Sequence, residues 1–423
     1  MAQPTKRRAS WLWLALPAAA RVRPSEHAAL MSLYEATSGA TWANNEHWDR
    51  TKDPCRLNGG PVPHRGFATQ PFRTDVRYEP TPWFGVGCID PCDDYLDGPD
   101  CTAGRILSLR LRDNGLSGSL NGWVGIGEMR NITHIDLSYN ALSGSIPTEI
   151  GQINNLEALI LRSNALSGAL PTEIADVNAN GVGRLAEVSL AVNRLEGTLP
   201  AALAQHAPSL LSLDVSNNSL SGTIPPEYAD MHALQVLYVH HNALSGSLPS
   251  ALTGSSGLTS LRYLQLQGNP RLSGTLPSDL GALTALYTLD AVGDALSGSL
   301  PTALGGLAAL HFLRMNDNAI SGSLPTQLGA LQRLETLDLY GNRFVGHMPS
   351  QLARLINLRL LYLPNEQLLP LRLRYCQQRL PNLGKYSYRL VREEYQRMAT
   401  SICPEPYDTL TAFGTLSELS GDV

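Results

Sequence analysis

The sequence predicts an α/β solenoid, a stack of similar units that each contribute one strand and one short helical turn. First, the stretch Ile135 to Gly151, IDLSYNALSGSIPTEIG, recurs with small changes about ten times. Second, each copy carries an amide or carboxylate marker, and successive markers lie 24 to 29 residues apart: Asn114, Asn140, Asn164, Asn193, Asn218, Asn242, Asn269, Asp294, Asn318 and Asn342. A base period of 24 with small insertions is typical of repeats that pack only against their neighbours.

The third observation is the pattern inside one unit. Apolar and polar residues alternate from Thr133 to Ser138, which indicates a strand with Ile135 and Leu137 facing inward. Stacked units place such strands side by side in parallel, about 4.8 Å apart. The marker amide can both donate and accept hydrogen bonds, so we expect a ladder of asparagines. Asp294 only accepts when ionised, and we expect a weaker or rearranged ladder there.

The second half of each unit turns the chain back. Leu142 and Ile146 add to the core, and Gly144 permits a tight, closely packed backbone. Pro147 fixes φ at the start of a short helical turn over 148–151. The repeats are expected to occupy residues 105–365.

The N-terminal end predicts export and a cap. Residues 1–20 combine a basic start, a short apolar run and Ala18-Ala19-Ala20, as in a secretory signal peptide; a tail of chance composition is the alternative. In the following segment, 21–104, we expect a helix from Ser25 to Thr37, with Trp42 and Trp48 covering the open end of the first repeat.

Six cysteines lie outside the regular repeats: Cys55, Cys88, Cys92, Cys101, Cys376 and Cys403. Export favours disulfides, and we expect Cys55–Cys88, Cys92–Cys101 and Cys376–Cys403, although the first four allow three pairings. The first four as a zinc site are the alternative.

The C-terminal end predicts a second cap. Residues 366–403 are expected to form a helical cap, and 404–423 a disordered tail. From 354 to 397 there are nine basic and three acidic residues. This charge either binds an acidic polysaccharide or partner or marks a solvated helix face.

The units resemble the plant-type leucine-rich repeat, LxxLxLxxNxLSGxIPxxLGxL, which residues 153–171 follow with few departures. Trp83-x-Gly85-Val86-x-Cys88 and Asp53-Pro54-Cys55 resemble the N-terminal cap of that family. The resemblance covers roughly residues 25–403. It implies a right-handed superhelix with a concave parallel β-sheet, short helical turns on the convex side, caps at both ends and a second β segment near the LSG stretch. The family includes receptor-like kinase ectodomains and secreted polygalacturonase-inhibiting proteins.

Between the inward leucines, the middle units place contact-forming side chains on exposed strand positions. We call this set the concave patch: Tyr238, His240, His241, Tyr263, Gln265, Gln267, Asp290, Phe312, Arg314, Asn316, Asp338 and Tyr340. A solvated sheet face is the alternative. Asn131 and Asn217 begin N-glycosylation sequons. A sugar on Asn217, at the strand edge, would obstruct the face nearby and favour binding in the C-terminal half.

These observations predict a secreted, non-enzymatic protein that recognises a protein, peptide or polysaccharide through the concave face, in inhibition, signalling or defence. No nucleophile, phosphate-loop or metalloprotease motif is found, and neither a cofactor nor a metal is expected; His240 and His241 should point apart. The net charge of −5 argues against nucleic acid, and no apolar run spans a membrane. The alternatives are a structural or adhesion matrix protein, or an intracellular scaffold if the signal is false.

Overall fold

The computed structural model describes residues 23–45, 48, 56–57, 60–61, 86–89, 105–178, 184–363 and 368–369. The predicted signal peptide, the C-terminal tail and all of the C-terminal cap except 368–369 lie outside the described residues. So do Cys55, Cys92, Cys101, Cys376 and Cys403, while Cys88 lies in strand β3. The predicted disulfides therefore remain predictions.

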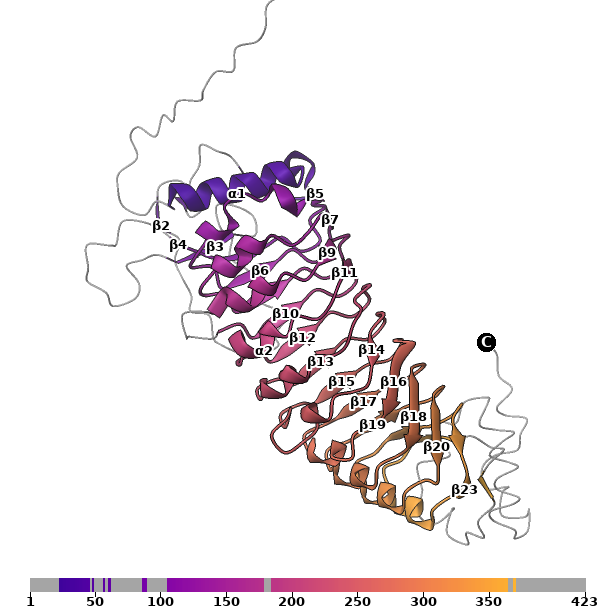
Figure 1. The fold of residues 1–423 in the computed structure, drawn as a ribbon. Coiled ribbons are helices and arrows are strands. Elements are labelled where there is room, and N and C mark those ends of the chain that lie inside the picture. The colour runs from indigo at the N-terminus through magenta and orange to yellow at the C-terminus, as the bar shows by residue number, and fades with distance from the viewer. Residues whose placement is uncertain are drawn as a thin grey trace, which may run out of the picture.

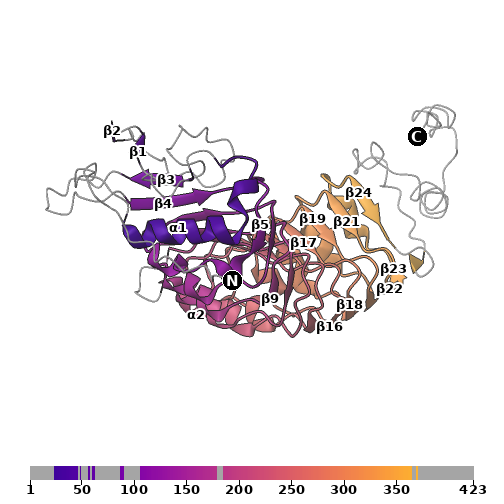
Figure 2. The same ribbon diagram turned by 90° about the horizontal axis from the view of Figure 1, so that it is seen from above.

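The main sheet runs the length of the described repeats and lines the inner side of a curved stack (Figures 1 and 2). It has twelve strands, of which β3 pairs antiparallel with β4 and the others pair in parallel, one strand per repeat. In sheet order the strands are β3 (Val86–Ile89), β4 (Arg105–Arg110), β6 (His134–Asp136), β8 (Ala158–Ile160), β10 (Glu187–Ser189), β12 (Ser212–Asp214), β13 (Val236–Tyr238), β15 (Tyr263–Gln265), β17 (Thr288–Asp290), β19 (Phe312–Arg314), β21 (Thr336–Asp338) and β24 (Leu360–Tyr362).

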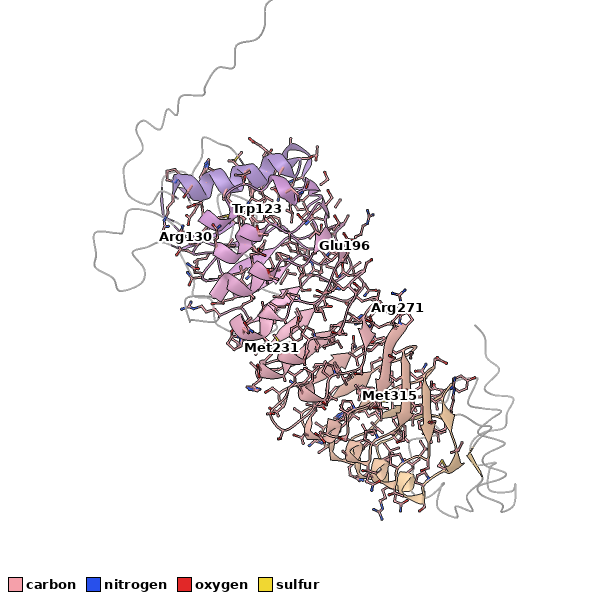
Figure 3. All side chains as sticks on the ribbon, in the orientation of Figure 1. Trp123, Arg130, Glu196, Met231, Arg271 and Met315 are labelled. Atoms are coloured by element: carbon pink, nitrogen blue, oxygen red, sulfur yellow. The ribbon has the colours of Figure 1, made fainter. Side chains whose placement is uncertain are left out.

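Short strands near the Leu-Ser-Gly stretches form further small sheets along one side of the stack, as the family resemblance implies. Exposed side chains such as Glu196 and Arg271 point outward from this side (Figure 3). The strands are β5 (Ser117–Ser119), β7 (Ala141–Ser143), β9 (Ser167–Ala169), β11 (Arg194–Glu196), β14 (Ser245–Gly246), β16 (Arg271–Thr275), β18 (Ala295–Ser299), β20 (Ala319–Gly322), β22 (Arg343–Phe344), β23 (Gly346–His347) and β25 (Leu368–Leu369), with β1 (Arg56–Leu57) and β2 (Gly60–Pro61) forming a separate hairpin.

The convex side is built from single helical turns. Most begin after a proline: Pro147, with φ −63°, precedes η4. Its ring presets the φ angle that the turn needs. The helical segments, where η marks a 3-10 helix, are α1 (Pro24–Ala36), η1 (Gly39–Thr41), η2 (Leu120–Gly122), η3 (Ile126–Glu128), η4 (Thr148–Gln152), η5 (Thr172–Asn178), α2 (Ala202–His206), η6 (Pro226–Asp230), η7 (Ser250–Leu252), η8 (Leu280–Ala282), η9 (Thr302–Gly306), η10 (Thr326–Ala330) and η11 (Ser350–Arg354). None of these is long and apolar enough to cross a bilayer.

The asparagine ladder predicted from the repeat is present. Asn164 accepts a hydrogen bond from the backbone N–H of Leu142 (3.0 Å) and donates from Nδ2 to the carbonyls of Leu137 and Leu161 (3.0 Å each). Each amide therefore bonds to its own repeat and to the repeat before it. Buried backbone groups at the turn are satisfied in this way, and leucines such as Leu137 pack beside them with no exposed surface.

The ladder is rearranged at Asp294, as expected. Its Oδ1 accepts from the backbone N–H of Asn269 (2.8 Å), whereas Oδ2 is buried and has no hydrogen-bond partner. Asp294 is 8% exposed, and burial raises the pKa of its carboxyl to about 7. Below about pH 7, a neutral carboxylic acid is therefore favoured where the other repeats hold a neutral amide.

Helix α1 lies across the first repeats and closes the N-terminal end of the core (Figure 1). The predicted helix, Ser25 to Thr37, matches it within one residue at each end. Trp42 and Trp48 are almost fully buried and meet edge to face, with ring centroids 4.8 Å apart. Asn44 exchanges two hydrogen bonds with Asn114, from Asn44 N to Oδ1 (2.7 Å) and from Nδ2 to Asn44 O (2.8 Å). The ladder therefore begins in the cap.

Candidate functional site: the concave face

Strand register brings the residues of the concave patch into rows. One row runs Tyr238, Gln265, Asp290, Arg314 and Asp338 across five neighbouring strands. The sequence therefore predicted correctly that these side chains are adjacent across the sheet. Parallel strands in identical register place equivalent positions about 4.8 Å apart.

A second row, nearer the start of each strand, alternates large and small side chains. It runs Tyr263, Thr288, Phe312 and Thr336 in register. Tyr263 and Phe312 are half-buried, whereas Thr288 and Thr336 are buried, with 7% and 5% exposure. The two rings therefore stand two strands apart, with a shorter side chain between them.

The remaining patch residues follow the strands, where the chain turns toward the outer side. His240, Gln267, Asn316 and Tyr340 occupy equivalent positions two residues after β13, β15, β19 and β21, and Tyr340 is 46% exposed. His241, one residue further on, has a left-handed φ of 52°. The equivalent residue has a positive φ in every repeat from Asp113 to Gly341, a conformation that is uncommon for residues other than glycine.

The structure adds two rings that the sequence did not single out. Tyr287 and His311 lie one residue before β17 and β19, and their rings stack with centroids 4.2 Å apart. The Tyr287 ring also lies against the rings of Tyr263 and Phe312, with centroids 5.7 Å and 5.6 Å apart. The four rings form one cluster at the N-terminal ends of β15, β17 and β19, and aromatic side chains of this kind often anchor interfaces. Both Tyr287 and His311 directly follow the first leucine of their unit, and this shared position in the repeat could have identified them from the sequence.

Charge in the patch is centred on Arg314. Its Nη1 lies 3.5 Å from Oδ2 of Asp290, and its guanidinium lies 5.5 Å from the centre of the Phe312 ring. Asp290 was expected to be exposed, and this was wrong: it is 5% exposed, with the longer Arg314 side chain of the next strand against its carboxylate. Burial raises the pKa of the Asp290 carboxyl, and Arg314 opposes this shift. Burial also raises the pKa of Asp338.

At the other end of the patch, Tyr238, His240 and His241 form an aromatic group. The rings of His240 and His241 meet edge to face at 5.4 Å, and Tyr238 lies 5.9 Å from His240. Burial lowers the pKa of His240, which favours its neutral imidazole. The two imidazoles are closer than the alternation of a strand predicted. Within the part of the chain that the structure describes, no three His, Cys, Asp or Glu side chains gather as metal ligands.

The two sequons differ in accessibility. Nδ2 of Asn131, the atom to which a glycan is attached, is buried and makes no hydrogen bond. Asn217 is exposed on the rim three residues after β12, with a left-handed φ of 54°. Of the two, only Asn217 presents an amide that a glycan can extend from without moving the fold.

The family model named Leucine Rich Repeat matches residues 131–153, 209–231, 233–255 and 333–355. Those segments carry the ladder asparagines and the strands of four repeats described above. The solenoid is built from leucine-rich repeats of the plant type.

Solved structures similar to these leucine-rich repeats include receptor ectodomains of Arabidopsis thaliana. The ectodomain of the membrane receptor kinase GASSHO1/SCHENGEN3, in complex with Casparian strip integrity factor 2, is 34% identical over 58% of this chain and 31% of its own, with a TM-score of 0.51. The HAESA ectodomain, in complex with an IDA peptide hormone that carries an N-terminal extension, is 28% identical over 67% of this chain and 44% of its own, with a TM-score of 0.56. This chain therefore spans less than half of either receptor chain.

A plant ice-binding protein shares the fold at 24% identity, covering 78% of this chain and 90% of its own, with a TM-score of 0.55. The same architecture thus occurs in proteins whose ligands differ in kind. Function has to be argued from the side chains of this chain's own faces.

Proposed function

We propose that this chain is a recognition protein that binds an extended peptide, or an extended segment of a protein, across the concave patch. The observation that carries the proposal is the cluster of Tyr263, Tyr287, His311 and Phe312 beside the Arg314–Asp290 pair. Aromatic side chains and arginine dominate binding energy at interfaces, and a rigid sheet presents them with little loss of conformational entropy. Both Arabidopsis ectodomains described above were solved with peptide or protein ligands.

The same proposal includes an extracellular place of action and a role in signalling, inhibition or defence, without catalysis. The signal-like residues 1–20, the even number of cysteines and the exposed sequon at Asn217 support export. The receptor ectodomains among the similar structures support it as well.

The test is a selection of displayed random dodecapeptides on the immobilised full chain, followed by titration of the enriched peptides. The double substitution Tyr263→Ala/Phe312→Ala removes both large side chains of the alternating row. Arg271→Ala, on the outer side of the stack, is the matched control. We expect the double variant to weaken binding at least about tenfold, the effect of losing one strong interface anchor, and the control to leave it unchanged.

Thermal unfolding of all variants checks that the solenoid is intact. Equal affinity of the wild type and the double variant for every enriched peptide would remove the concave patch as the binding surface. Failure of any peptide to enrich over a bare support would reject the recognition of extended peptides altogether.

A further inference from the structure

Two arginines rest on one tyrosine ring at the N-terminal half of the concave face. We call this group the arginine–tyrosine stack: Arg112 after β4, Tyr139 after β6 and Arg162 after β8. The guanidinium carbons of Arg112 and Arg162 lie 4.6 Å and 5.4 Å from the centre of the Tyr139 ring, which is 40% exposed. A guanidinium held over a ring by cation–π attraction keeps its N–H edge free for a second partner.

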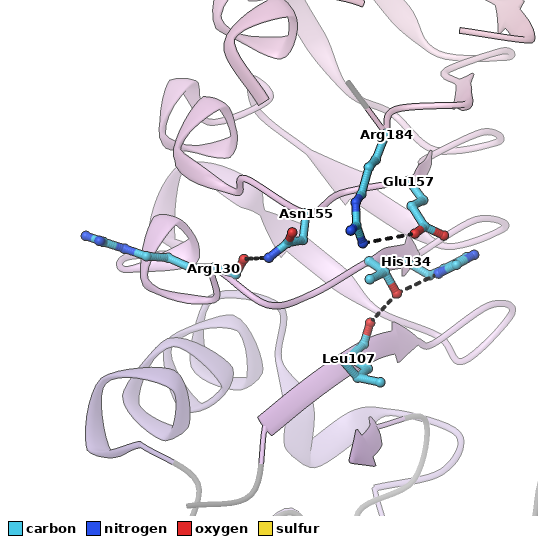
Figure 4. Close-up of polar contacts among 7 residues, drawn as sticks. Leu107, Arg130, His134, Asn155, Glu157 and Arg184 are labelled. Atoms are coloured by element: carbon cyan, nitrogen blue, oxygen red, sulfur yellow. Dashed lines mark hydrogen bonds and ion pairs between the residues drawn. The ribbon is translucent and has the colours of Figure 1, made fainter. Parts of the chain in front are cut away.

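No carboxylate of the described residues occupies those edges. Glu157, which precedes β8, is paired with Arg184 at 4.0 Å (Figure 4). Neither arginine of the stack has a carboxylate oxygen within 4.0 Å in the described part of the chain. Asp136 is engaged locally, because its Oδ1 accepts from the backbone N–H (3.0 Å) and the hydroxyl (2.6 Å) of Ser138. Nε of Arg162 is buried and has no hydrogen-bond partner.

Two aliphatic side chains lie beside the stack. Val192, which follows β10 on the same rim, is 45% exposed, and Ile160 on β8 is half-buried. An isolated anion would gain nothing from these aliphatic groups, and the hydroxyl-rich rings of a polyuronate would bury less apolar surface on them than aliphatic side chains do. An acidic peptide with aliphatic neighbours would use both features, because it supplies carboxylates to the guanidinium edges and methyl groups to the apolar surface.

We infer that the arginine–tyrosine stack is a second recognition site, which takes a carboxylate-bearing peptide segment with aliphatic residues next to its acidic ones. It is separate from the concave patch, since β10 and β12 lie between β8 and β13, and Asn217 stands on the rim after β12. The cation–π contacts orient both guanidiniums before the ligand arrives, so the carboxylate meets donors that are already aligned. Binding is charge-dependent and weakens as salt is added.

The test uses the same dodecapeptide selection on the full chain, now with Arg112→Gln/Arg162→Gln as the counter-target. Glutamine keeps a polar side chain of similar reach and removes both positive charges. The matched control is Arg130→Gln, because the Arg130 side chain points away from the concave face (Figure 4). We expect a class of peptides rich in Asp and Glu beside Leu, Ile or Val, which binds the double variant at least tenfold more weakly and the control equally well.

This experiment distinguishes binding at the concave patch from binding at the arginine–tyrosine stack. Peptides that depend on Tyr263 and Phe312 report the concave patch, and peptides that depend on Arg112 and Arg162 report the stack. If the enriched peptides depend only on the first pair, the proposed function stands and the second site is refuted. The second site is also refuted if the peptides lost on the double variant carry no excess of acidic residues. The same holds if pectate, a polyuronate, is retained by the wild type and lost on the variant while no acidic peptide is enriched.

Discussion

Replacing Asp294 by asparagine should remove a pH dependence that the wild-type solenoid carries. In the wild type, Oδ1 of Asp294 accepts from Asn269 and Oδ2 faces buried surroundings without a partner. Asparagine keeps the acceptor and adds an Nδ2 donor at the position where its counterparts bond to carbonyls of two repeats. The substitution therefore restores the ladder that the other repeats use.

The size of the expected change in stability follows from the pKa of the Asp294 carboxyl. Its pKa is about 7 in the folded chain, against an ordinary value of 3.8 that applies once the chain unfolds. That difference corresponds to about 4 kcal/mol of stability, at about 1.4 kcal/mol per pH unit. The folded state holds the proton more tightly, so this stability is fully present below about pH 4 and is lost as the pH rises to about 7. The asparagine variant has no such loss.

Urea unfolding at pH 4, 5.5, 7 and 8 measures the free energy of unfolding of both proteins, with amide hydrogen exchange of Asn269 and its neighbours as a local probe. The gap between Asp294→Asn and the wild type should widen by up to about 4 kcal/mol from pH 4 to pH 8. The exposed Asp279→Asn is the control and should leave the profile of the wild type unchanged. Parallel profiles of the wild type and Asp294→Asn over this range would refute the reasoning.

Three further outcomes are expected. Gly298→Ala should destabilise the chain by about 1–3 kcal/mol in urea unfolding, because its φ is +74° and a Cβ would overlap the preceding repeat, whereas Gly254→Ala, in open space, should change it by less than about 0.5 kcal/mol. Asn164→Ala should cost about 3 kcal/mol in the same assay, since it leaves buried backbone groups of two repeats without partners. Glycopeptide mass spectrometry of material from a eukaryotic secretory host should find a glycan on Asn217 and none on Asn131; the reverse occupancy would contradict the burial of the Asn131 amide.

The repeats could be predicted because their cause is local and repeated. Three features recur along the repeats: the alternation around Ile135 and Leu137, the marker amides and the proline before the turn. The same pattern in several copies makes the prediction for each one more secure. The helix of the cap was found within one residue for a similar reason, since Pro24 and the apolar face of α1 act over a few residues.

The site was predicted less completely, because its features depend on contacts between repeats. Tyr287 and His311 stack only when two units lie in register, and each lies one residue outside the strand that the alternation marks. Asp290 is buried on a strand position where the alternation predicts exposure, and the Arg314 side chain against its carboxylate comes from the next repeat. Arg112 and Arg162 are 50 residues apart in the sequence and are brought to one ring only by the stacking of three repeats.

The alternating row Tyr263, Thr288, Phe312 and Thr336 sets a fixed spacing between the large rings on the sheet. Large rings on every second strand are separated by twice the strand spacing, or about 9.6 Å. A polyproline II helix has three residues per turn and a rise of about 3.1 Å, so it presents the same face every 9.3 Å or so. A ligand in that conformation would place every third side chain against a ring, because its repeat matches the spacing of the rings. In a flat β-strand the side chains on one face recur every two residues, and this repeat does not match the spacing of the rings.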